Sequence, residues 1–295
     1  VKSGKATDLV LRTGEATTSL KQITNTQGNL DITGNGLLQV QNLTAEHGSI
    51  SLDSDTTCTG TLAAAGKVRV SGTSAARVHH LNAGELEVAA SGRLTATGSA
   101  EVNGSVQLGG TVQMNTLKAG SVTMTGSGTL ESSSISAASI TAGGVSASCG
   151  STAAPLFSNG VRLDESGITA GSMSGATLEV AGTEVLRAAS TDSSISISAT
   201  GIQAEGSVTA AEVRLSPVCT IRAARLQADT MSDEGSATSL SGATLTGVHS
   251  LSGTAASVKS VEADSITLAE GYQLSAASPS EHMQSFMVPP SLIPR

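Results

Sequence analysis

The chain has 295 residues, of which 38% are hydrophobic and 14% are charged, and its formal net charge is −8. It contains no Trp, one Tyr and two Phe, so it lacks the aromatic side chains that fill the wide core of an ordinary globular domain. Its hydrophobic content is too high for a disordered linker, and an acidic chain without a basic run excludes nucleic acid as a partner. The composition predicts a narrow core of small and β-branched residues that repeats along an axis.

A short motif recurs through the first 150 residues, in which a Gly is followed by alternating polar and apolar residues. It occupies residues 28–32, 48–52, 66–70, 84–88, 104–108 and 120–124, and its glycines are 20, 18, 18, 20 and 16 residues apart. Alternation with a period of two is typical of a strand with one buried face. A repeat of 18–20 residues fits one coil of a β-helix. We therefore predict an all-β fold, a parallel β-helix or β-solenoid with coils of about 18–20 residues.

The first apolar position of each motif is expected to stack on its counterpart in the next coil, about 4.8 Å away. This core column consists of Leu30, Ile50, Val68, Leu86, Val106 and Val122. Each coil is expected to contain two or three short strands separated by tight corners. About 250 residues coiled in this way predict a rod on the order of 60 Å long.

The repeat becomes less regular after about residue 150. A corner motif of the form Leu/Ile-x-Ala-Gly continues at 140–143 and 168–171, but its spacing varies, and no proline precedes Pro155. Proline cannot donate a hydrogen bond to a strand ladder. We predict a regular solenoid over residues 1–150, a second β-helical section over 155–277 that further chains can complete, and a proline-containing, non-solenoid tail over 278–295.

Two families resemble parts of the chain. Residues 1–150 resemble filamentous-haemagglutinin-type adhesins in their short Gly-x-Val-x-Leu strands and their abundant Ala, Ser and Thr. A sarcoglycan ectodomain is similar to residues 155–216, and the likeness rests on residues 155–158, 184–190, 195–197, 201–206 and 212–216. Sarcoglycans are single-span cell-surface proteins whose ectodomains form a β-helix of several chains. The resemblance implies a surface-attached or secreted rod, with any membrane helix in a segment outside this sequence.

Few residues are candidates for catalysis or metal binding. The five histidines are His47, His79, His80, His249 and His282. His79 and His80 are adjacent, so on a strand we expect them to point to opposite faces. The acidic pairs Asp53/Asp55 and Asp233/Glu234 are expected in solvated turns, although the first pair also resembles a calcium-binding loop. Residues 171–175 resemble a nucleophile elbow, but Met173 stands at the nucleophile position. We expect no catalytic residue, no metal site and no cofactor.

The three cysteines and two of the asparagines are candidates for covalent modification, through disulfide bonds or N-linked glycans. Cys58, Cys149 and Cys219 match no zinc or redox motif, and their odd number leaves at least one thiol free or paired with another chain. Of these interpretations we favour buried free cysteines that act as small hydrophobic residues. Asn42 and Asn103 each begin an Asn-x-Ser/Thr triplet and are candidate N-glycosylation sites in a secreted eukaryotic chain.

These features predict a structural subunit of an extracellular or cell-surface filament. The end coils of such a rod carry unpaired strand edges, so we expect it to form homo- or hetero-oligomers with other β-helical chains. A first alternative is a secreted adhesin that binds a receptor through its outer faces. A tailspike-like enzyme acting on glycans is a second alternative, which the shortage of Trp and Tyr disfavours. No stretch of about 18 apolar residues is present, so membrane attachment is expected only through a segment outside this chain.

Overall fold

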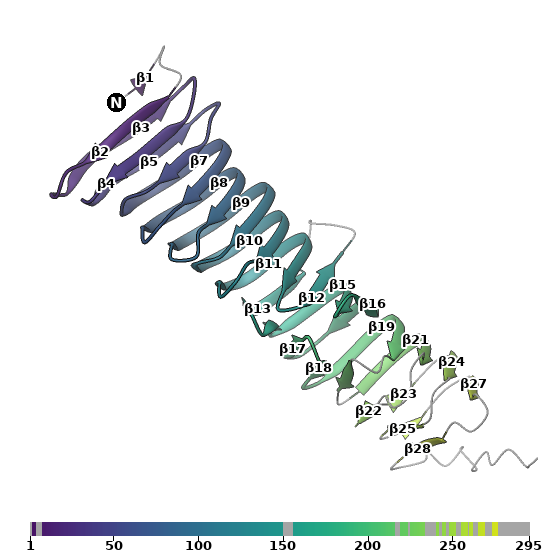
Figure 1. Cartoon of the computed structure of the whole chain (residues 1–295). Helices are drawn as coiled ribbons and strands as arrows, with labels where there is room; N and C mark the ends of the chain where they lie inside the picture. The colour runs from purple at the N-terminus through teal and green to yellow at the C-terminus, as the bar shows by residue number, and fades with distance from the viewer. Residues whose placement is uncertain are drawn as a thin grey trace, which may run out of the picture.

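The computed structural model describes residues 2–3, 8–149, 156–215, 219–223 and 225–233, and short strands between 240 and 276. Over these residues the protein is all-β and contains no helix. Its strands stack along one axis into a long β-solenoid with the N-terminal strands at one end (Figure 1). The predicted tail at 278–295 lies outside the described residues.

The strands fall into three groups along the chain. The first group is β1 (Lys2–Ser3), β2 (Leu9–Thr13), β3 (Thr18–Asn25), β4 (Leu30–Gly34), β5 (Leu38–Ala45), β6 (Ile50–Leu52), β7 (Thr56–Val70), β8 (Ala75–Val88), β9 (Arg93–Leu108), β10 (Thr111–Met124) and β11 (Thr129–Ala142). The second group is β12 (Val145–Ser148), β13 (Phe157–Asp164), β14 (Gly167–Ala170), β15 (Ser172–Val180), β16 (Thr183–Thr191), β17 (Ile195–Ser198), β18 (Gly201–Ala204) and β19 (Ser207–Leu215). The third group is β20 (Thr220–Arg222), β21 (Arg225–Asp233), β22 (Leu240–Ser241), β23 (Thr244–Leu245), β24 (Val248–Leu251), β25 (Ala255–Val258), β26 (Ser260–Val261), β27 (Ser265–Leu268) and β28 (Gln273–Ala276).

The coils of the first group are parallel, and each lies in register with the next. From β7 to β11 a single strand of 14 to 16 residues bends around a corner, so the prediction of separate short strands is wrong for these coils. Register shifts mark the corners, as between Cys58 and Thr61 or between Ala64 and Lys67. Such bulges let the backbone turn without leaving the ladder.

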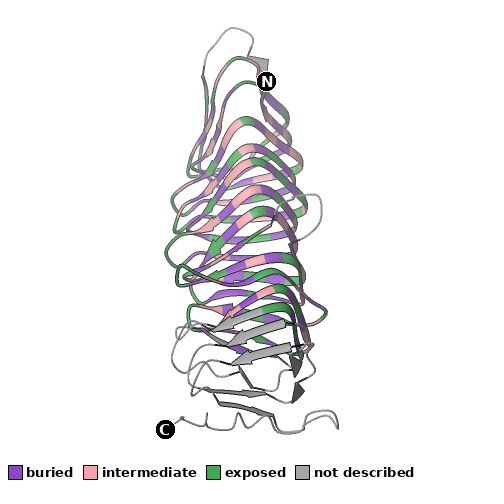
Figure 2. Cartoon of the chain, turned by 90° about the vertical axis from the view of Figure 1, so that its right-hand side faces the viewer, coloured by how far each residue is buried: buried purple, intermediate pink, exposed green. Residues whose placement is uncertain are grey.

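The core column runs unbroken through the first group. Each of its six residues is the register partner of the next, and none is more than 1% exposed. Figure 2 shows buried positions alternating with intermediate and exposed ones along the coils that are coloured by burial. Each buried Leu, Ile or Val stabilises the fold by about 1.5–3 kcal/mol relative to an exposed position, so the stack itself supplies the core that aromatic residues supply elsewhere.

The chain reverses direction after β11. β12 pairs antiparallel with β11, and antiparallel pairing continues to β18 and β19. The first reversal is a hairpin at Gly143 and Gly144, whose φ angles of 55° and 77° lie in the left-handed region that favours glycine. The chain runs back across the face that it has just crossed, in the opposite direction, while the stack still advances by one rung. The prediction of parallel coils therefore holds for β1–β11 and again from β18, but not between them.

The core column continues through this antiparallel section despite the reversals. From Val122 it passes to the buried residues Ile140, Ala147, Leu178, Leu186 and Val213. Beyond Val213 the backbone register continues to Met231, His249 and Ile266. At about 4.8 Å between strands, the column from Leu9 to Ile266 is about 70 Å long. The division into two solenoid domains near residue 150 stays a prediction.

Candidate functional site

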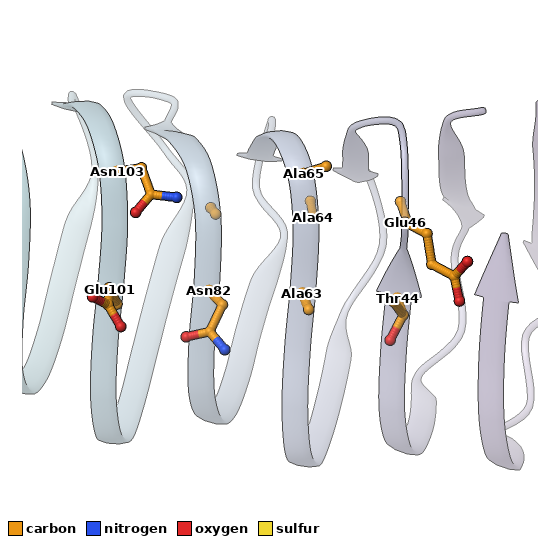
Figure 3. Close-up of a pocket in the computed structure, with 10 residues that line it drawn as sticks. Thr44, Glu46, Ala63, Ala64, Ala65, Asn82, Glu101 and Asn103 are labelled. Atoms are coloured by element: carbon orange, nitrogen blue, oxygen red, sulfur yellow. The ribbon is translucent and has the colours of Figure 1, made fainter. Parts of the chain in front are cut away.

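A groove of about 340 Å³ crosses the outer surface of β5, β7, β8 and β9 (Figure 3). It is lined by Thr44, Ala45, Glu46, Ala63, Ala64, Ala65, Asn82, Ala83, Glu101 and Asn103. Thr44, Ala63, Asn82 and Glu101 are successive register partners on adjacent coils. The short side chain of Ala63 stands in a row of longer polar ones, so the surface is hollowed at β7.

The lining of this groove favours hydrogen bonding to a polar ligand. Asn82 and Asn103 supply amides, and Glu46 and Glu101 supply carboxylates. Glu101 also forms an ion pair with Lys118 at 3.1 Å. Sequence reasoning missed the groove, although the run of three alanines at 63–65 is a signal for a local hollow.

A second group of charges lies at the β13–β14 hairpin, and two of its members, Arg162 and Glu131, line another open hollow. The Asp164 carboxylate accepts hydrogen bonds from the backbone N–H and hydroxyl of Ser166 and from Arg162 Nε. Arg162 also pairs with Glu131 of β11 at 3.0 Å. The Ser166 hydroxyl first, and then Arg162, hold the pKa of Asp164 below its usual range. These contacts tie the reversed section to the regular coils.

We expect Asp164→Asn to lower the free energy of unfolding at pH 7 by about 1 kcal/mol, because the partly exposed site loses charge-assisted hydrogen bonds. The folded pKa is lowered, so this contribution is present above about pH 4, the unfolded value, and is lost as pH falls through the folded pKa. Urea titrations of both proteins from pH 7 to pH 2 should show the gap closing below pH 4. A gap that stays constant to pH 2 would contradict this role.

The histidine pair differs from the prediction. The rings of His79 and His80 have centroids 4.1 Å apart, and neither side chain is buried, so the expectation of opposite faces is wrong. The register between β8 and β9 shifts between Val78 and Leu81, and this corner interrupts the strict alternation. His79 Nδ1 lies 3.0 Å from Thr97 Oγ1, and His80 Nδ1 lies 3.0 Å from Ser99 Oγ.

Three of the four residues of the acidic pairs, Asp53, Asp55 and Asp233, lie in the described part of the chain. Asp53 and Asp55 lie in the turn between β6 and β7, and Asp55 Oδ1 accepts the Ala75 N–H at 2.9 Å. Asp233 belongs to β21, and Glu234 lies outside the described residues. Among the described residues, no three His, Cys, Asp or Glu side chains are grouped so that they could hold a metal ion. Met173, at the centre of the elbow-like stretch, is buried in the core.

The two glycosylation triplets lie in different environments. Asn42 is partly buried at a corner of β5, where its Oδ1 accepts the Thr61 N–H of the next coil at 3.0 Å. Asn103 is exposed at the groove. Asn103 is therefore the better placed of the two for modification.

We expect Asn42→Ala to lower the free energy of unfolding by about 1 kcal/mol, because the Thr61 N–H loses its acceptor. The matched change Asn103→Ala, at an exposed position, should alter it by less than about 0.5 kcal/mol. Urea unfolding followed by circular dichroism measures both. Equal losses for the two variants would contradict the assignment of Asn42 to the corner.

None of the three cysteines forms a disulfide in the described part of the chain. Cys58 and Cys219 are buried in the core. Burial raises the pKa of Cys58, and it raises the pKa of Cys219 to about 11, so both thiols are held in the unreactive protonated form. Cys149 is partly exposed. Pairing with another chain stays a prediction.

Comparisons of the sequence and of the fold with known proteins found no match. No protein-family model and no curated protein matches the sequence, and no solved structure matches the fold. Within the described residues, no helix has the length and apolar character needed to cross a bilayer. The β-solenoid is thus established from the structure itself, without a link to the sarcoglycans or to the haemagglutinin-type adhesins.

Proposed function

We propose that this chain is a structural subunit of an extracellular or cell-surface filament, in which it acts as a rigid β-helical rod and not as an enzyme. The observation that carries the proposal is the continuous register of the stack, in which each rung pairs in register with the next from Leu9 to Ile266. A stack held by continuous ladders resists bending and sets a fixed length.

The outer surface also supports a structural role. Opposite charges line neighbouring coils, as where Lys67 lies 3.5 Å from Glu85 and 3.1 Å from Glu87. Exposed pairs of this kind contribute about 0–1 kcal/mol each, so they add little to stability beside the buried core. The likeness of residues 155–216 to a sarcoglycan ectodomain agrees with a surface rod built from several chains, and this family assignment is part of the proposal.

Immunogold electron microscopy of cells that produce the protein tests the proposed function. The expected result is gold label along filaments on the cell surface, and loss of that label when intact cells are treated with protease. Label confined to the cell interior, or surface label on unassembled material, would overturn the proposal.

The groove supports a second candidate, an adhesin that binds a polar ligand on a receptor. Ala65→Arg would fill the groove at an exposed position, whereas Gln107→Arg places the same charge on an exposed residue outside the groove lining. An adhesin that uses the groove would lose cell binding in the first variant alone. Equal binding by both variants would exclude this use of the groove.

A further inference from the structure

The first rung of the solenoid has an open strand edge. β2 pairs with β4 and with no other described strand. β3 pairs with β5 along its length, while β1 covers only Thr24 and Asn25 of β3. An edge of this kind is a template for pairing with a further strand.

The side chains of this rung are incompletely covered. Leu9, Leu11 and Leu20 are only partly buried, whereas their register partners in the next rung are at most 3% exposed. Those partners are Leu30, Ile32 and Val40. Val10 is 52% exposed and is the only exposed large hydrophobic residue among the described side chains. An apolar residue here is unusual, because its register partners in the next two coils are Asp31 and Ser51.

Val10 also directs its backbone groups to the open side. The Leu9 N–H donates to the Asn29 carbonyl at 2.9 Å, on the side of β4. Successive residues of a parallel strand direct their backbone groups to opposite neighbours. The N–H and C=O of Val10 therefore face the open edge, beside its exposed side chain.

The other end of the rod carries a strand that matches this edge. β27 pairs with β24 and with no other described strand. Its Ile266 occupies the register position that Leu9 occupies at the first rung, at the two ends of one column. Four antiparallel steps separate β2 from β27, namely β11–β12, β12–β15, β15–β16 and β16–β19. Because this number is even, β2 and β27 run in the same direction.

We propose that the β2 edge docks the β27 strand of a second copy of this chain, so that copies stack head to tail and continue the parallel ladder and the core column. The inference rests on the proposed filament role and names the partner and the surface that it uses. A head-to-tail contact that continues the stack along its own axis does not close into a ring, so it generates a linear filament.

Sedimentation velocity of the purified chain over a range of concentrations tests the docking edge. Wild type should form linear oligomers that lengthen with concentration. Val10→Pro should weaken association at least about tenfold, because it removes the edge N–H while breaking no hydrogen bond to another described strand. Val10→Thr keeps the N–H and the β-branched shape, so it should associate within about threefold of wild type. Equal thermal unfolding midpoints for the two variants would show that Val10→Pro leaves the fold intact.

A crosslinking experiment identifies the partner strand independently of variant stability. In a Cys149→Ser background, Val10→Cys combined with Thr267→Cys should give an oxidised ladder of dimers, trimers and longer species. Each single substitution should give dimers at most. Wild-type association by Val10→Pro, or a double variant that stops at dimers, would overturn the docking edge and leave the surface filament role standing. Missing surface filaments in cells would overturn the filament role even if the purified chain stacks.

Discussion

Val122→Asp is expected to unfold the middle coils, with a loss of about 4 kcal/mol or more in the free energy of unfolding. Val122 is 1% exposed and lies between Val106 and Ile140 in the core column. A carboxylate at this position has no partner and no water, and an unpaired buried charge costs several kcal/mol. Because each rung contacts only its neighbours, the damage should centre on the adjacent coils.

The adjacent residue provides the control for this prediction. Thr123 is half-buried on the outer face, and its register partners Gln107 and Thr141 carry no charge. Thr123→Asp should therefore cost less than about 1 kcal/mol. Hydrogen exchange followed by mass spectrometry should show lost protection over β9–β11 in Val122→Asp alone. A similar loss of protection in both variants would mean that the assignment of Val122 to the buried face and Thr123 to the outer face is wrong.

Gly167→Ala is expected to lower the free energy of unfolding by about 2–4 kcal/mol, through overpacking and left-handed strain together. Gly167 has a φ of 129° at the start of β14, and an added Cβ would fall on the carbonyl oxygen of Ile197 in β17. The backbones of β14 and β17 pair at this point, so neither can yield without breaking the ladder. The residue lies at the hairpin that reverses the chain between β13 and β14.

Gly182→Ala is the control that measures the cost of left-handed backbone strain without a steric clash at the added Cβ. Gly182 has a φ of 77° at the β15–β16 hairpin, but no atom lies within 4 Å of an added Cβ. It should cost only the strain of a left-handed alanine, about 1–2 kcal/mol. Urea titrations of both variants measure the difference. A smaller loss for Gly167→Ala than for Gly182→Ala would contradict the close approach of β14 and β17.

The parallel coils could be predicted from the sequence, but the reversals could not. The Gly-polar-apolar repeat marks one buried position per coil, which is why Leu30 and its successors could be placed in one column. Period-two alternation is the same for a strand in either direction, so nothing in it distinguishes β12–β17 from further parallel coils. The Gly143-Gly144 pair is the available signal for a hairpin, but its first glycine also completes the corner motif at 140–143.

The surface was harder to predict than the core for a related reason. Corners shift the register, so the outward direction of residues such as His79 and His80 depends on bulges that alternation alone does not show. The groove at Ala63 depends on which residues of neighbouring coils meet. The open edge at Val10 depends on whether another strand lies beyond β2 in space. Predicting these features requires the strand register of the whole stack.

The distance between spin labels at Gln39 and Gln203 tests the continuous stack most directly. Both residues are exposed and lie in one outer row of register partners, with Thr57, Arg77, Thr95, Gln113, Glu131, Arg162, Thr169 and Ser196 between them. With the three native cysteines replaced by alanine, pulsed electron paramagnetic resonance should give a narrow distribution near about 43 Å, nine rungs at about 4.8 Å each. A broad distribution, or one centred well below about 30 Å, would contradict a single rigid rod with that rung spacing.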